Sequence, residues 1–199
     1  QGSLFVRLDY ADVAAWREWL PLPGQIVTGT GALRIWFEFA HQEPLEITAD
    51  VELANVKAKL GAQLPEIELA HLSGRVGTRK SGAEREVFTR ALAFTTMSGE
   101  RLDPTHFTLT VREGPGDRVE SARIEFDQLQ LGPLVALGAY LPLPDRIRAD
   151  LARFAPRGTL NHGHLRWEGP ADAPTTYVAA AEFTQLGLLA QDAFPGAMG

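Results

Sequence analysis

Histidines are the first place to look for metal or catalytic chemistry in this chain of 199 residues. His162 and His164 are separated by one residue, and alternate residues of a β-strand point to the same face. Two imidazoles on one face could begin a zinc site, but such sites need three or four protein ligands. Only Glu168 follows nearby as a further ligand. We therefore interpret the pair as part of a solvent-facing strand and expect no metal site.

The other reactive residue types are not arranged for catalysis. Ser73 lies near His71, but no Gly-x-Ser-x-Gly turn surrounds a serine. Gly74 and Gly77 are not followed by Gly-Lys-Ser/Thr, so they do not form a phosphate-binding loop. The chain has no cysteine, which excludes disulfides and thiolate metal sites. We expect no catalytic residues, no enzyme activity and no cofactor.

Composition indicates a globular chain with an acidic balance. Hydrophobic residues make up 45% of the sequence, which excludes wholesale disorder. The net charge is −6, so there is no basic excess to bind the phosphates of nucleic acid. No apolar run approaches the roughly 20 residues of a membrane span, and no signal peptide opens the chain.

Most of the sequence alternates between apolar and polar residues, the pattern of β-strands that bury one face. The clearest segments are 33–39, 45–53, 107–111, 122–126 and 177–183. Gly114-Pro115-Gly116-Asp117 is the clearest predicted hairpin turn, and Asp103-Pro104-Thr105 is predicted to open another turn. The expected fold class is mainly β: an antiparallel, strongly curved or gutter-like sheet of repeated β-units. A β-sandwich is the alternative.

Three short helices are expected to interrupt the strands, near residues 12–20, 133–141 and 145–155. Asp12 can cap the first helix, and Pro133 suits the first turn of the second. In the third, Ile147, Leu151 and Phe154 fall on one helical face.

The order of these elements occurs twice. The strand pattern around Asp9 leads to a short helix and a Leu-Pro-Leu-Pro motif. The pattern around Asp127 leads to the same elements roughly 120 residues later. Related segments also start at Val51 and Ala181. We therefore divide the chain into a first repeat unit, 1–120, and a second, truncated unit, 121–199. A repeated unit favours an extended, stacked architecture over a single enzyme pocket.

Three short helices are too few to cover the apolar face of so much strand. Either a second sheet covers this face, or a curved sheet leaves it open to an apolar ligand such as acyl chains. Alternation alone does not separate the two possibilities. The apolar stripe that would line an open groove consists of Leu33, Ile35, Phe37, Phe39, Ile47, Val51, Leu53, Phe107, Leu109, Val111, Ile124, Phe126 and Phe183.

Several segments resemble the YhdP branch of the AsmA-like proteins of Gram-negative bacteria, and together the resemblance covers nearly the whole chain. They are Asn55–Pro65, Leu69–Gly77, Arg90–Phe94, Pro104–Phe107, Ile124–Leu134, Leu151–Leu160 and Leu165–Gly169. None of them carries a catalytic signature. The resemblance therefore bears on identity more directly than on mechanism.

The resemblance implies a long periplasmic protein, anchored in the inner membrane by an N-terminal helix. Its body would be a repeating β-groove that carries phospholipid between the inner and outer membranes. This chain lacks the anchor and would be an internal segment of such a protein. Its partners would be phospholipid acyl chains, adjoining repeats of the same longer chain and envelope proteins. The alternative function is a structural or protein-interaction β-module of a cell-envelope complex, without lipid binding.

Overall fold

The computed structural model describes residues 2–13, 25–40, 43–116, 118–141, 143–170 and 174–189. These residues form strands and two short helices. The elements are β1 (Gly2–Asp12), β2 (Gln25–Ala40), β3 (Glu43–Lys59), β4 (Ile67–Ser81), β5 (Glu84–Thr96), β6 (Arg101–Gly114), β7 (Arg118–Gln130), α1 (Leu131–Leu137), α2 (Asp145–Phe154), β8 (Arg157–Glu168) and β9 (Thr176–Gly187).

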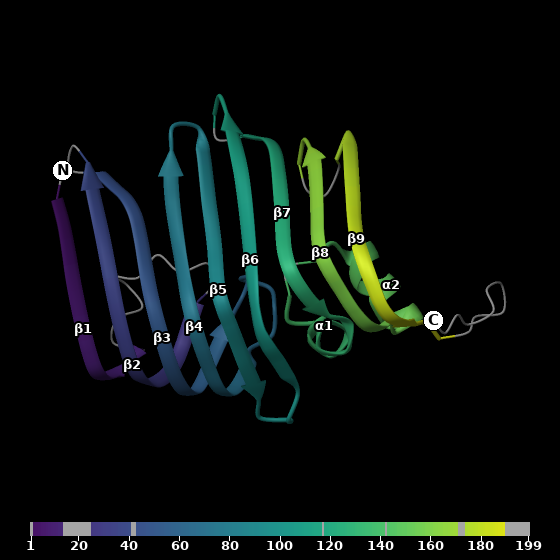
Figure 1. Cartoon of the computed structure of the whole chain (residues 1–199), viewed down its shortest axis with the longest axis horizontal. Coiled ribbons are helices and arrows are strands. Elements are labelled where there is room, and N and C mark those ends of the chain that lie inside the picture. The colour runs from purple at the N-terminus through teal and green to yellow at the C-terminus, as the bar shows by residue number, and fades with distance from the viewer. Residues whose placement is uncertain are drawn as a thin grey trace.

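All nine strands belong to one sheet, in which they follow each other in chain order (Figure 1). Every neighbouring pair is antiparallel, and β1 does not pair with β9, so the sheet is not closed. The predicted mainly β, antiparallel, curved sheet is confirmed. The sandwich alternative needs two sheets and does not describe these strands. The boundary between the two expected repeat units falls inside β7, and that division stays a prediction.

Bulges cross the sheet and bend it. The strand register shifts at Leu8/Ala11, Ser73/Arg75, Thr89/Leu92 and Asn161/His164. Asn55 and Ala91 have positive φ angles in this region, at 53° and 49°. A bulge bends its strand and increases the local twist. In Figure 1 the strands accordingly run straight in their upper parts and curl at their lower ends.

The curled sheet buries one of its faces. Ile35 of β2 joins Val56 of β3 and Ile67 of β4 in one core cluster. Ile35 lies on one side of the bulges, whereas Val56 and Ile67 lie on the other. Because both arms of the sheet contribute to one cluster, the sheet curls around this face. We call it the inner face and the opposite one the outer face.

The two described helices follow β7 and lie beside the lower ends of β7 to β9 (Figure 1). Helix α2 confirms the helix expected near 145–155, and Ala155, at φ 38°, ends it in the left-handed region. The expected helix 133–141 is wrong at both ends, because α1 spans Leu131–Leu137. The Gly138 N–H donates to the Val135 carbonyl, three residues back, which tightens the last turn and ends the helix.

The helix expected near 12–20 lies outside the described residues, apart from Asp12 and Val13. The turn expected at Asp103-Pro104-Thr105 is wrong, because these residues lie inside β6. Pro104 is tolerated there because the register between β5 and β6 is irregular at this point, and bulges accept a residue without an N–H. No helix among the described residues is long and apolar enough to cross a membrane.

Candidate functional site: the apolar inner face

The predicted groove residues share the inner face. Residues directly opposite each other in an antiparallel sheet point to the same side. Phe37 lies opposite Ile47, and Leu109 lies opposite Ile124. The remaining predicted residues follow by alternation or pairing and occupy the same face: Leu33, Ile35, Phe39, Val51, Leu53, Phe107, Val111, Phe126 and Phe183. Their role in binding stays a prediction.

The inner face contains apolar residues that the sequence analysis did not single out. Val6 and Leu8 of β1, Val87 of β5 and Leu165 of β8 each lie opposite a predicted groove residue. The same alternation marks these residues, so their signal was available in the sequence. Trp167 follows from Leu165 by the same alternation, and it lies opposite Ala122.

Accessibility changes along the inner face. Under β2 and β3 the face is a packed core, in which Leu33, Ile35 and Leu53 are at most 3% exposed. Under β6 and β7 its large apolar residues, among them Phe107 and Phe126, are half-buried, whereas Ala122 is buried. On β9, Phe183 is 59% exposed. The inner face is therefore filled by its own side chains in the middle of β2 and β3. It is open to solvent at both edge strands, because Leu4 on β1, which lies opposite Phe37, is 53% exposed as well.

One aromatic ring lies directly over the backbone of the inner face. Gly163 of β8 is opposite Phe126 of β7, and a Cβ atom at position 163 would collide with the Phe126 ring. Because Gly163 has no side chain, the ring can lie across β8. Phe126 consequently presents an aromatic surface on the part of the inner face that is half-buried.

The outer face is polar and ion-paired. Arg75 donates two hydrogen bonds to Asp50, at 2.5 and 2.9 Å, and its guanidinium lies 5.2 Å from the centre of the Trp36 ring. The hydrogen bond from Arg75 lowers the pKa of Asp50, although burial opposes the shift. The sheet therefore has one apolar face and one hydrated face, and only the inner face suits an apolar ligand.

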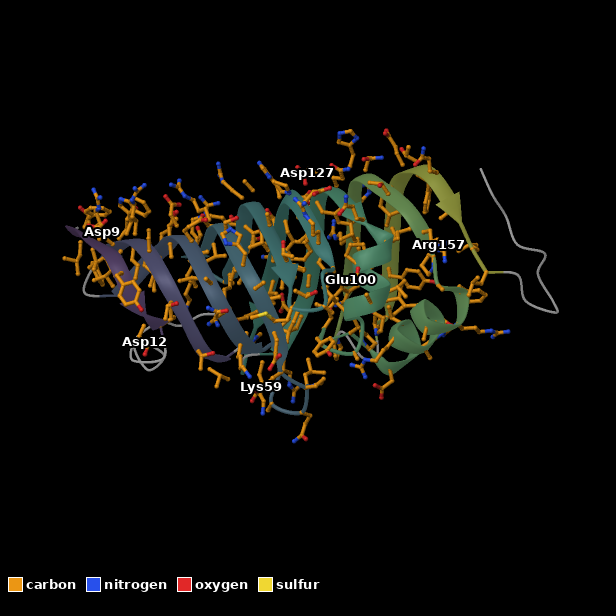
Figure 2. The ribbon with its side chains drawn as sticks, turned by 90° about the horizontal axis from the view of Figure 1, so that it is seen from below. Asp9, Asp12, Lys59, Glu100, Asp127 and Arg157 are labelled. Atoms are coloured by element: carbon orange, nitrogen blue, oxygen red, sulfur yellow. The ribbon has the colours of Figure 1, made fainter. Side chains whose placement is uncertain are left out.

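Asp127 stabilises the bend where β6 and β7 pass the bulges. Its Oδ1 atom accepts hydrogen bonds from the Thr105 hydroxyl (2.8 Å) and from the backbone N–H groups of His106 and Gln128 (both 2.7 Å). Burial alone would raise the pKa of Asp127, but these hydrogen bonds outweigh it and lower the pKa. Asp9, its counterpart in the sequence repeat, lies along the same long side of the sheet (Figure 2).

The lowered pKa makes a prediction for Asp127→Asn. A carboxyl with a depressed pKa in the folded state stabilises the fold above its unfolded pKa, which is about 3.9. This stabilisation is lost as the pH falls through the lower folded pKa. We therefore expect the variant to be less stable than the wild type at pH 7 and to lose less stability on acidification. Urea unfolding between about pH 7 and pH 2 measures both effects.

Asp9→Asn is the matched control for this prediction. Asp9 accepts one side-chain hydrogen bond, from Arg7 at 2.8 Å, and its side chain is 79% exposed. An exposed pair of this kind contributes little. Equal pH profiles for the two variants would contradict the role assigned to Asp127.

The histidine pair departs from the arrangement expected for it. His162 lies at a bulge with φ 50°, so the strict alternation expected for it and His164 does not hold. Its Nδ1 atom is 3.4 Å from Glu182 on β9. No group of three or more potential metal ligands occurs within the part of the chain that the structure describes.

Comparison with known proteins gives one match. A family model described as YhdP protein matches residues 1–199, the whole chain. No curated protein and no solved structure matches.

Proposed function

The chain belongs to the YhdP family, and from this premise we propose that it is a segment of a periplasmic, bridge-like lipid transport protein. The longer protein would be anchored in the inner membrane and would carry phospholipid between the inner and outer membranes along the inner face. The observation that supports this proposal most directly is the apolar face itself. It continues across every strand of an unclosed sheet and becomes accessible toward β9.

The physics of an apolar face suits transport. Moving an acyl chain from water onto such a surface gains about 0.8 kcal/mol for each buried CH₂ group. This gain does not depend on direction, so a chain can slide along the accessible part of the face without a fixed binding position. Adjoining repeats of the same longer chain would extend the path at β1 and β9, whose outer edges pair with no strand among the described residues. A non-catalytic role is part of the proposal.

Native mass spectrometry of the purified chain tests the proposal, combined with lipid extraction. The expected result is co-purified phospholipid at about one molecule per chain or more. A folded, monodisperse chain that stays free of lipid after incubation with phospholipid vesicles would contradict it.

Phe126→Asp should reduce phospholipid occupancy about tenfold, because a carboxylate on the inner face would have to be desolvated by the acyl chain. Phe37→Asp is expected to act in the same direction. Ser121→Asp is the matched control, since Ser121 lies on the outer face of β7, opposite Arg112. Occupancy is measured by extraction from folded protein, with circular dichroism as the test of folding. Equal occupancy in Phe126→Asp and Ser121→Asp would show that the inner face is not the binding surface.

The packed core under β2 and β3 favours a second candidate, a structural or protein-interaction module of an envelope complex. There the inner face is closed by its own side chains, and Leu53 is 1% exposed. This candidate predicts a stable chain that binds no lipid, so the same mass spectrometry experiment separates it from the first.

A further inference from the structure

One row of residues runs along the upper margin of the inner face. Strand pairing connects its members directly from β4 to β9. We call these residues the rim row: Lys80, Arg85, Val111, Ala122, Trp167 and Tyr177. Two of the six are cations and two are aromatic residues with a polar atom, so the row is chemically unlike the rest of the inner face.

The next row toward the bend is apolar apart from one threonine. It consists of Thr78, Val87, Leu109, Ile124, Leu165 and Ala179, about 7 Å below the rim row. Polarity thus changes across the inner face in the order found at a membrane surface. Hydrocarbon-like side chains lie deep, and above them come Trp, Tyr and cationic residues, which are enriched at the headgroup level of bilayers.

The two cations of the rim row lie opposite each other and repel. Lys80 lies directly opposite Arg85, and like charges in this arrangement are destabilising. Arg85 is 3.6 Å from Glu113, whereas Lys80 makes no ion pair with any described residue. Neighbouring strands are about 5 Å apart, so both side chains can reach one anion. An anionic group between them would remove the repulsion.

The indole N–H of Trp167, also in the rim row, lacks a hydrogen-bond acceptor within the described part of the chain. Its indole Nε1 atom is shielded from solvent and has no hydrogen-bond partner among the described residues. A buried donor without an acceptor is unfavourable, and such exceptions are rare in native structures. A ligand oxygen at the level of the rim row would provide the missing acceptor.

The opposite margin of the inner face differs on β3. On β3, Ala58 faces inward, so its neighbours Lys57 and Lys59 face outward. Each is already paired: Lys57 with Glu68 at 2.6 Å and Lys59 with Glu66 at 3.6 Å. Lys59 marks this margin in Figure 2. The lysines at this margin of β3 are therefore outward and paired, unlike Lys80 of the rim row.

We propose that the rim row binds the headgroup region of a glycerophospholipid, with the phosphate between Lys80 and Arg85. Resting on the proposed lipid transport, this inference fixes the orientation of the lipid. The phosphate lies at the β4–β9 rim and the acyl chains lie on the apolar rows below it. Trp167, three strands from Arg85 and about 15 Å away, donates to an ester or phosphate oxygen at a second position along the same path. The ligand class is a diacyl lipid with an anionic phosphate.

The test compares two lipids with the same acyl chains. The chain is incubated with vesicles of dioleoylphosphatidylcholine that contain either dioleoylphosphatidylglycerol or dioleoylglycerol, and the bound lipid is quantified by mass spectrometry. Lys80→Gln with Arg85→Gln should lower phosphatidylglycerol occupancy about tenfold and leave dioleoylglycerol occupancy unchanged. Arg79→Gln with Arg112→Gln is the matched control. It removes two positive charges from the same end of the sheet, on β4 and β6, but on the outer face.

A second variant addresses the indole donor. Trp167→Phe keeps an aromatic ring and removes the N–H, and it should lower occupancy of phosphatidylglycerol about threefold. Inorganic phosphate at millimolar concentration is the probe for a free-anion site, and it should not displace bound phosphatidylglycerol. Displacement would overturn the assignment to a lipid headgroup.

The outcomes separate this inference from the proposed function. If the wild type binds both lipids and the Lys80/Arg85 variant binds both equally well, the headgroup site is wrong and the apolar path stands. If the inner-face and outer-face double variants lost equal phosphatidylglycerol occupancy, the site would also be overturned. Such a loss would depend on the net charge of the protein and not on the position of the cations. If the wild type binds neither lipid, the proposed transport function itself fails.

Discussion

Gly74→Val is expected to lower the free energy of unfolding by about 4 kcal/mol, because Gly74 lies in a bulge at the bend of the sheet. Gly74 has a φ of 131°, a conformation that a β-branched residue strongly disfavours. A Cβ atom there would lie 2.7 Å from the carbonyl oxygen of Ala91 and 2.8 Å from the Cα atom of Leu92. Both contacts are with the backbone of β5, so no rotation of a side chain can relieve them. Urea denaturation of the variant measures the loss.

Gly132→Ala is the control for this substitution. Gly132 lies in α1, and a Cβ atom added there would meet nothing within 4 Å. Alanine also favours a helix over glycine by up to about 1 kcal/mol, so this variant should match or exceed the wild type in stability. If the urea midpoint of Gly74→Val were as high as that of Gly132→Ala, the bend would not depend on the close approach of β4 and β5.

The strands were predictable because the sheet buries one face and hydrates the other. This difference imposes the alternation seen at 107–111 and 122–126, and both segments lie in strands that pair as expected. The one-sided pattern also identified the inner face correctly. It did so because residues two apart on a strand share a side, whichever strands are neighbours.

The bend was not predictable from the same pattern. Asn55 and Ala91 hold positive φ angles although neither is a glycine, and no local sequence signal requires this of alanine. Pro104 indicates a turn by its chemistry, yet it is accommodated in a bulge of β6. Helix α1 ends early, at a backbone hydrogen bond from Gly138 to Val135. Each of these features is decided by the neighbouring strand or turn.

The sequence pattern also did not predict which residues of the candidate site are exposed. Leu53 and Phe183 occupy equivalent places in the two related segments that start at Val51 and Ala181. Leu53 lies between β2 and β4, and 1% of it is exposed, whereas Phe183 lies on the edge strand β9 and is 59% exposed. Equivalent residues thus serve as core in one segment and as accessible surface in the other. Their neighbours decide the difference.

This contrast leads to the second prediction, which compares Leu53→Ala with Phe183→Ala. Truncating a fully buried leucine removes its transfer free energy and leaves a cavity, so Leu53→Ala should cost about 3 kcal/mol of stability. Phe183→Ala should cost less than about 1 kcal/mol, although the side chain it removes is larger, because Phe183 is mostly hydrated already. Urea denaturation of both variants under the same conditions measures the two losses.

Lipid occupancy should respond in the opposite order. Phe183 offers accessible apolar area at an open edge of the inner face, so its loss should reduce phospholipid binding more than the loss of Leu53 does, in protein that is folded in both cases. Phenylalanine at position 53, Leu53→Phe, is a further check, since overpacking a closed core costs about 1 to 3 kcal/mol, whereas an open groove would accept the ring. If Leu53→Ala left stability unchanged, or if Leu53→Phe raised lipid binding, the inner face under β2 to β4 would be open in solution, and acyl chains would have access to its whole length.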